Sequence, residues 1–392
     1  MTALPNPIVD GSRLRILHLP VDLGGHPAAL ARAQRALGHD AVAANLAWSP
    51  FGFHGDINHA VEPGKPCRLV RRELGRVALL ARAFRADVIH AHFGQTLFSL
   101  RPFPITDPSR HGLVERATVA AARALWMGDL ALWRRMGKAL AMTFYGDDVR
   151  LVSGAVERNP WSHLGLPEIA RAYEERDPWK RLLGDKLGRA GVTLFAVNPD
   201  LLDTLPAGAE FLPYAHVDLG REALDALAST LRTERELRLL HLPSDRAVKG
   251  TEIIVSIVDR LRAEGVACRL TVVENLKRDE VPALFARHDA LIDQLRVGWY
   301  GGVAVEAMAA CRPALAHIAP RDLQHIPHQM AADLPVIAVT ADTLAAKIRE
   351  LAALDSAAFR SLGLRSRAFA QHWHAPEAAA RRTIAAYRSQ LG

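Results

Sequence analysis

The sequence contains few cysteines, and the three present, Cys67, Cys268 and Cys311, lie far apart. An odd, scattered set argues against a disulfide framework and a structural zinc site, and it is typical of a reducing cytosol. Blocks of like charge are also missing, so the sequence does not indicate a partner among the nucleic acids. The net charge of +7 is equally compatible with anionic substrates and with an anionic membrane surface.

No hydrophobic run is long enough to cross a bilayer. The most hydrophobic long segment, residues 118–133, is interrupted by Arg123 and Asp129, and residues 1–15 lack the apolar centre of a signal peptide. We therefore expect a cytoplasmic protein, either free or attached peripherally to the inner face of the membrane. A chain of 392 residues with 49% hydrophobic residues is long enough for two domains, each with its own core.

Short apolar runs alternate with amphipathic helical patterns in both halves of the chain. We expect helices at residues 28–37, 251–263 and 376–391, and strands at residues 15–19, 41–45, 88–92, 192–197, 210–213, 237–240, 269–273, 290–294, 314–318 and 335–339, with another beginning at residue 141. This alternation predicts an α/β fold with two Rossmann-like, doubly wound domains that face a central cleft.

The stretch from residue 297 to residue 316 contains the first candidate site. Gly301 and Gly302 lie between an apolar strand and an alanine-rich helix that carries Glu306 near its start. Such a turn offers backbone N–H groups and the positive end of a helix dipole to an anion, and a nearby carboxylate suits hydroxyl groups. The combination indicates a nucleotide or a nucleotide-sugar, whereas the alternative is a tight turn without a ligand.

A basic loop in the same half of the chain strengthens the first interpretation. Arg246 and Lys249 are three residues apart and precede the helix expected at residues 251–263. An arginine fork and a lysine point charge complement each other on phosphate oxygens, so we expect both cations to converge on one diphosphate. The alternative, two exposed basic residues without a ligand, is the weaker one beside the glycine turn.

The N-terminal half holds weaker candidates. Gly24 and Gly25 follow the first strand, and His90 and His92 share one face of a strand. A metal requires at least a third ligand, and none is evident, so we expect no metal site. Residues 47–66 form a long aromatic and glycine-rich loop, which is either an acceptor-contacting loop or surface decoration.

A helical stretch at residues 114–141 has two possible roles. It carries Trp126 and Trp133 together with Arg134, Arg135 and Lys138. A basic helix with interfacial tryptophans can rest on anionic lipid, and the more common alternative is that it packs on its own domain.

Several of these segments resemble the retaining GT-B glycosyltransferases of family 4. Trp299, Tyr300, Gly301, the Glu-Ala-Met-Ala run at 306–309 and Pro313 match the C-terminal signature of that family, and residues 87–94 match one of its N-terminal strands. Gly146, Asp148 and Arg150 match a further element, in which Tyr145 replaces a histidine. The first glutamate of the family's pair is replaced by Gly298, and Asp293 and Gln294 are candidates for a polar substitute.

The resemblance implies a retaining transferase that moves a hexose-type sugar from a nucleotide-diphosphate sugar to a hydroxyl of a surface glycan, a lipid or a small metabolite. It implies no metal and no other cofactor. The implied organisation is a flexible leader (1–13), an acceptor-binding domain (14–215), a linker (216–235), a nucleotide-sugar-binding domain (236–374) and a helix that crosses back to the N-terminal domain (375–392).

The resemblance also assigns roles to residues. The implied catalytic residues are Arg246, Lys249 and Glu306. Donor binding is implied for Gly24, Gly25, Arg246, Lys249, Glu274, Gln294, Tyr300, Gly301, Gly302, Val303 and Glu306, and the acceptor or sugar side for His92, Tyr145 and Asp148. Because of Gly298 and Tyr145, a non-catalytic nucleotide-sugar-binding homologue remains the alternative. A GT-B epimerase or phosphorylase would need an acid–base set or a pyridoxal lysine that is not evident.

Overall fold

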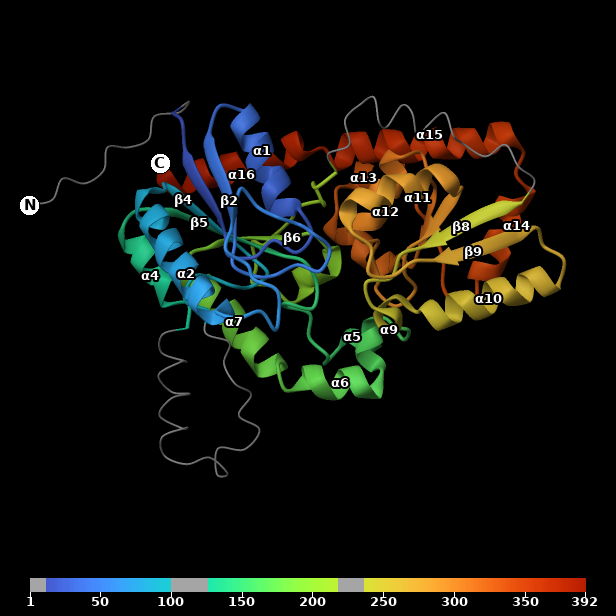
Figure 1. Cartoon of the computed structure of the whole chain (residues 1–392), viewed down its shortest axis with the longest axis horizontal. Helices are drawn as coiled ribbons and strands as arrows, with labels where there is room; N and C mark the ends of the chain where they lie inside the picture. Colours follow the sequence, from blue (N-terminus) through green and yellow to red (C-terminus); the bar gives the residue numbers. More distant parts are fainter. Residues whose placement is uncertain (1–11, 100–125, 218–235) are drawn as a thin grey trace, which may run out of the picture.

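The computed structural model describes residues 12–99, 126–217 and 236–392 of the chain. It shows two lobes, each built around a parallel sheet with helices on its faces (Figure 1). The N-terminal sheet has seven strands in the order β3-β2-β1-β4-β5-β6-β7, and the C-terminal sheet has five in the order β12-β11-β10-β8-β9. This architecture confirms the predicted α/β fold with two doubly wound sheets.

The N-terminal lobe alternates strands and helices from residue 15 onward. Its strands are β1 (Arg15–Leu19), β2 (Asp40–Asn45), β3 (Ile57–Asn58), β4 (Val88–His92), β5 (Ala139–Phe144), β6 (Thr193–Ala196) and β7 (Glu210–Phe211). Its helices are α1 (His26–Ala36), α2 (Arg68–Arg85), α4 (Gly128–Arg135), α5 (Ala155–Arg158), α6 (Pro167–Glu174) and α7 (Asp177–Ala190), with short 3-10 turns at η2 (His163–Gly165) and η3 (Pro199–Asp203). Strands β4 and β5 are buried at every position, because helices cover both faces of a parallel sheet.

The C-terminal lobe follows the same plan. Its strands are β8 (Leu237–His241), β9 (Cys268–Val272), β10 (Ala290–Ile292), β11 (Ala314–Ala316) and β12 (Ile337–Ala338). Its helices are α9 (Arg246–Lys249), α10 (Thr251–Ala263), α11 (Val281–Arg287), α12 (Gly302–Ala309), α13 (His328–Asp333), α14 (Leu344–Ala353) and α15 (Ser356–Trp373), with 3-10 turns at η4 (Arg278–Glu280) and η5 (Pro320–His325). Strand β10 ends at Ile292, so Asp293 and Gln294 begin the loop that follows it.

The last helix, α16 (Pro376–Leu391), leaves the C-terminal lobe and packs against α1 and β5 of the N-terminal lobe (Figure 1). Ala380, Ile384 and Tyr387 join the core that lies between α1 and the sheet. The side-chain amide of Gln390 bonds both the backbone N–H and the carbonyl of Leu140, each at 2.9 Å. These contacts tie the end of the chain to its first domain.

Parts of three expected segments lie outside the described residues: 1–11 of the leader, 218–235 of the linker and 114–125 of the basic helical stretch. The described remainder of that stretch includes α4, and the side chains of Trp126 and Trp133 are buried in the N-terminal core. Among the helices of the three described ranges, none is both long enough and apolar enough to cross a membrane.

Candidate functional site

A cavity of about 280 Å³ lies between the two lobes. The strands of each sheet are parallel, so their carboxyl ends meet at one edge, where ligand crevices form in doubly wound folds. The N-terminal lobe contributes loops after β1 and β2, and the C-terminal lobe contributes the loops after β8, β9 and β10. The wall includes Gly24, Phe51, Phe53, Tyr214, His216, Ser244, Lys249, Asn275, Gly302, Val303 and Glu306.

Lys249 is the cation in this wall. Its ammonium donates to Asp293 Oδ1 at 2.6 Å and to Gln294 Oε1 at 2.7 Å, and the Asp293 side chain is wholly buried. The other oxygen of Asp293 accepts the backbone N–H of Gly301. An ammonium has three donors, so this arrangement fixes Lys249 while one N–H remains for a ligand in the cavity.

Glu306 and Gly302, both on α12, form another part of the same wall. Glu306 Oε1 lies 3.2 Å from Nε2 of His216, and both side chains are largely buried. A β-carbon at Gly302 would lie 2.8 Å from the His216 ring, so glycine is required there by close approach. The N–H of Gly301 is engaged by Asp293, which leaves Gly302 and Val303 as the residues of the first helical turn that line the cavity.

Arg246 does not join Lys249. Its guanidinium bonds Glu252 at 2.6 Å and Glu274 at 3.0 Å, and its side chain is 41% exposed. The two expected donor-binding residues Arg246 and Glu274 are therefore paired with each other at the surface, outside the residues that line the cavity.

Several other residues expected to bind the donor form hydrogen bonds within the protein instead. Gln294 donates its amide to the carbonyl of Trp299, and the buried Tyr300 hydroxyl lies 2.9 Å from Nε2 of His374. Gly24 lines the cavity, whereas Gly25 adopts a left-handed φ of 76° and gives its N–H to Asp22. Burial raises the pKa of the Asp22 carboxyl, which also accepts the N–H of Ala28 at the start of α1.

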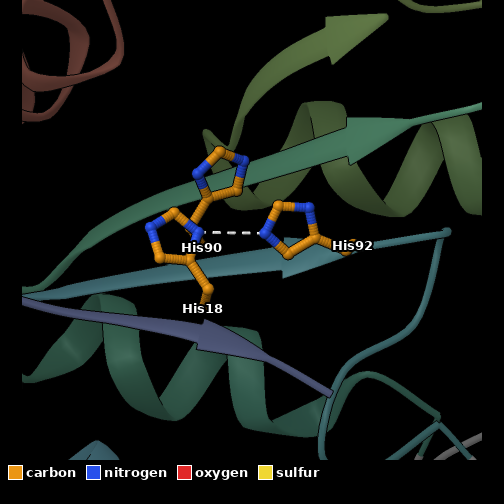
Figure 2. A group of neighbouring side chains, drawn as sticks. All are labelled: His18, His90 and His92. Atoms are coloured by element: carbon orange, nitrogen blue, oxygen red, sulfur yellow. Dashed lines mark hydrogen bonds between the residues drawn. The ribbon is translucent and has the colours of Figure 1, made fainter. Parts of the chain in front are cut away.

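The expected pair His90 and His92 is part of a cluster of three. The register of β1 and β4 places His18 opposite His90, and ring nitrogens of His18, His90 and His92 lie within 4.8 Å of one another (Figure 2). The third imidazole was not foreseen, because it belongs to a strand distant in sequence. Burial lowers the pKa of His18 to about 4 and lowers the pKa values of His90 and His92 well below 6.5, so the three rings are neutral.

Each of the six ring nitrogens in this cluster already has a hydrogen-bonding partner. His18 contacts His92 and Gln34, and His92 also contacts the Tyr145 hydroxyl. His90 contacts the hydroxyls of Tyr387 and Thr143. A metal ion would have to displace these partners, so a hydrogen-bonded core describes the cluster better than a ligand set does.

The direction of these hydrogen bonds follows from one backbone carbonyl. Thr383 on α16 donates to the carbonyl of Ala380, so its oxygen accepts from the Gln34 amide nitrogen. The Gln34 oxygen therefore accepts from Nε2–H of His18, whose Nδ1 then accepts from Nε2–H of His92. Nδ1 of His92 is left as the acceptor for the Tyr145 hydroxyl, at 2.9 Å.

Tyr145 follows β5 at the carboxyl edge of the sheet, where its side chain is partly exposed. Since its proton points inward to His92, its oxygen offers lone pairs and accepts hydrogen bonds. Asp148 accepts the N–H groups of Tyr145 and Gly146 and so shapes the turn, and burial raises its pKa to about 6. His92 itself is fully buried, and its Nδ1 contacts the Tyr145 hydroxyl.

A smaller cavity of about 30 Å³ lies beside Gly298, between Arg150 and Asn159 of the N-terminal lobe and Arg296 of the C-terminal lobe. A β-carbon at residue 298 would lie 3.0 Å from the Ala319 β-carbon and 3.3 Å from an oxygen of Asp322. A glutamate there would collide with both residues. Asp322 places a buried carboxyl beside this position, whereas Asp293 and Gln294, the expected substitutes, both bind Lys249.

The comparisons with known proteins concern the fold. A scan against models of protein families finds no match, and a search of curated proteins finds none either. A sucrose-phosphate synthase from Thermosynechococcus elongatus superposes with a TM-score of 0.57 at 17% identity, over 96% of this chain and 99% of that chain. Anabaena HepE, solved with UDP and glucose, superposes with a TM-score of 0.53 at 13% identity, over 96% of this chain and 100% of that chain.

WaaG, a glycosyltransferase involved in lipopolysaccharide biosynthesis, gives a TM-score of 0.51 at 15% identity, over 94% of this chain and 98% of that chain. These likenesses confirm the expected fold, which is that of the GT-B glycosyltransferases. Membership of family 4 stays a prediction.

Proposed function

We propose that this chain is a glycosyltransferase that uses a nucleotide-diphosphate sugar. The observation that carries the proposal is the cavity between the lobes, which brings Lys249, the first turn of α12 and Glu306 into one wall. Lysine and helix N-terminal N–H groups suit a diphosphate, and a carboxylate suits the hydroxyls of a ribose. Each of these groups comes from the C-terminal lobe, which is therefore the donor side.

The proposed reaction transfers a hexose-type sugar with retention of its anomeric configuration. The bond between the sugar C1 and the β-phosphate oxygen breaks, and a bond from C1 to the acceptor oxygen forms on the same face. The acceptor proton passes to the departing diphosphate oxygen, so no protein base is needed. Negative charge grows on the diphosphate as its bond to C1 lengthens, and Lys249 stabilises that charge without a metal.

Support for the donor class comes from the solved structures of the same fold. HepE was solved with UDP and glucose, and the other two proteins are a sucrose-phosphate synthase and a glycosyltransferase involved in lipopolysaccharide biosynthesis. Phe51 and Phe53 line the cavity from the N-terminal lobe. In the proposed reaction the acceptor, a hydroxyl of a glycan, a lipid or a small metabolite, approaches from this lobe.

One observation favours a second candidate, a homologue that binds the donor without turning it over. The charge of Lys249 is already opposed by the buried carboxylate of Asp293, at 2.6 Å, and residue 298 carries no side chain. Such a protein would bind the nucleotide-sugar and release neither free nucleotide nor product.

Thermal unfolding in the presence of UDP-, GDP-, ADP- and dTDP-sugars tests the donor site. We expect one nucleotide class to raise the Tm, and we expect Glu306→Gln to remove that rise. Glu350→Gln is the matched control, since Glu350 pairs with Lys347 on the surface of α14. Absence of a shift with every donor would contradict the proposal.

Turnover of the donor that binds separates the two candidates. Release of free nucleotide with an acceptor would support the transferase, and proton NMR of the product anomer would show retention or inversion. Activity that survives a chelator is expected if Lys249 replaces a metal. Donor binding without any turnover would favour the non-catalytic homologue.

A further inference from the structure

Helix α2 presents an apolar stripe to solvent. Val70, Leu74 and Val77 are 59%, 65% and 66% exposed, Phe84 is 47% exposed, and Ala81 is also exposed. The spacing of these five positions is four, three, four and three, which keeps them on one face of a helix. The opposite face, with Gly75, Leu79 and Ala83, is buried against the N-terminal lobe. Scattered apolar residues on a surface are normal, whereas a continuous stripe marks an interaction site.

The same helix is strongly basic. It carries six arginines and one acidic residue, Glu73, so its 18 residues have a net charge of six minus one, or +5. Arg72 and Arg76 pair with Glu73. Four arginines are exposed and form no ion pair with any part of the chain that the structure describes: Arg68, Arg71, Arg82 and Arg85.

The position of α2 leaves this face accessible. The helix lies on the flank of the N-terminal lobe, beside α4, where Phe84 packs edge-on against Trp133 with ring centroids 5.1 Å apart (Figure 1). The donor cavity lies elsewhere, between the lobes, so occupation of α2 would leave the donor path open.

We propose that α2 is an interfacial helix that docks the protein on an anionic lipid surface. An apolar stripe with exposed arginines along one side matches a bilayer surface in both respects: the stripe enters the boundary of the acyl chains, and the guanidinium groups meet lipid phosphates. A second protein copy is a poorer occupant, because two such helices would bring eight unpaired arginines together. The inference goes beyond the proposed transfer reaction and does not depend on it.

The described part of the basic stretch, residues 126–141, does not turn its tryptophans to the surface. Trp126 and Trp133 are buried in the core, so they are unavailable to lipid in this structure. On α2 both the apolar and the basic groups are exposed, and Leu132 and Met136, on and just after the neighbouring α4, add two exposed apolar side chains to the same flank.

Sedimentation of the full chain with vesicles tests the inference. We expect binding to phosphatidylcholine vesicles that contain phosphatidylglycerol, little binding to pure phosphatidylcholine, and release by salt. Replacement of Arg68, Arg71, Arg82 and Arg85 by glutamine should weaken partition on the order of a hundredfold, because each cation near the surface adds attraction. A matched control carries the same loss of charge elsewhere, at Arg260, Arg269, Arg349 and Arg381, and should bind like the parent chain.

A second variant tests the contribution of the apolar stripe separately from that of the arginines. Val70→Gln, Leu74→Gln and Val77→Gln together should weaken vesicle binding roughly tenfold or more, whereas Leu364→Gln on α15, which is 48% exposed, should not. Equal binding by the arginine variant and its control would overturn the proposal. So would a parent chain that is dimeric in solution and becomes monomeric in the apolar variant, since a second copy would then cover the stripe. These measurements need no donor, so their failure is distinct from failure of the transferase proposal.

Discussion

Lys249, which lines the larger cavity, forms a close charge pair with Asp293 behind it, and the contributions of this pair to stability and to donor binding are separable. Lys249→Met leaves a wholly buried carboxylate without its cation, so we expect the free energy of unfolding to fall by about 3–5 kcal/mol. Adding Asp293→Asn removes the unpaired charge and should restore more than half of that loss. Urea denaturation measures both changes.

Donor binding should respond differently, because both variants lack the cation. The Tm rise produced by the nucleotide-sugar should disappear in the single variant and stay absent in the double variant. A double variant that regains the ligand-induced shift would show that Lys249 acts only as a structural partner of Asp293.

Gly302 tests the close approach of α12 to His216. In Gly302→Ala, the new methyl group would lie 2.8 Å from the ring, which must then shift and disturb its 3.2 Å contact with Glu306. We expect a loss of about 1–3 kcal/mol in unfolding free energy, as for other overpacked sites, and a weaker response to donor. Gly24→Ala is the stability control, since its methyl group meets no atom within 4 Å. If His216→Ala does not relieve the loss, the clash is not its cause.

At the scale of elements, α16 completes a buried polar layer as well as an apolar one. The Tyr387 hydroxyl accepts from the Gln34 amide and donates to His90 Nδ1 at 2.6 Å. Tyr387→Phe leaves both groups buried with one partner fewer, so we expect about 1–3 kcal/mol of destabilisation in urea denaturation. Tyr173→Phe on the half-exposed α6 should change little, and an equal effect of both substitutions would refute the role assigned to the polar layer.

The elements were largely predictable because their sequence patterns are strong. The limits of β1, α10 and α16 agree with the periodicity of residues 15–19, 251–263 and 376–391. Strand β3, which has only two residues, lies inside a loop rich in glycine and aromatic residues, and nothing in that composition indicates it. Short edge strands depend on pairing with a neighbour, here β2, which sequence patterns do not show.

The candidate site was predictable only where its residues belong to local sequence motifs. Lys249, Gly302 and Glu306 belong to local motifs with recognisable spacing, and the structure brings them to one cavity wall. His216 and Asp322 escaped notice, because their placement depends on contacts between segments far apart in sequence. Tyr300 adjoins the same glycine turn, but its side chain is buried against His374, and a motif does not reveal which way a side chain points.

At the scale of the whole molecule, the two lobes also meet at a group of charged side chains beside the smaller cavity. Asp203 on η3 contacts His325 at 2.8 Å and Arg321 at 3.5 Å, both from η5 of the other lobe. Asn159 donates to the carbonyl of Arg296 at 3.0 Å, which adds a neutral contact between the lobes. Asp322 of η5 also lies near enough to Asp200 and Asp203 of η3 for the three carboxyl groups to interact electrostatically.

Asp322 makes this junction sensitive to pH. Burial, followed by the nearby carboxylates Asp200 and Asp203, raises the pKa of Asp322 to about 7, while Arg158 opposes the shift. In the unfolded chain the same carboxyl titrates near 3.9. The folded state therefore holds a proton that the unfolded state releases, so its stabilising effect is present at low pH and is lost as the pH rises through about 7.

Asp322→Asn should remove this dependence. Because solvent screens part of the junction, we expect the variant to gain about 2 kcal/mol relative to the parent chain between pH 5 and pH 8, rather than the full value of the shift. Urea denaturation at both pH values measures the difference, and Asp342→Asn, outside the junction, is the control. If the two variants show the same pH profile, Asp322 titrates normally and the contact between the lobes does not depend on its proton.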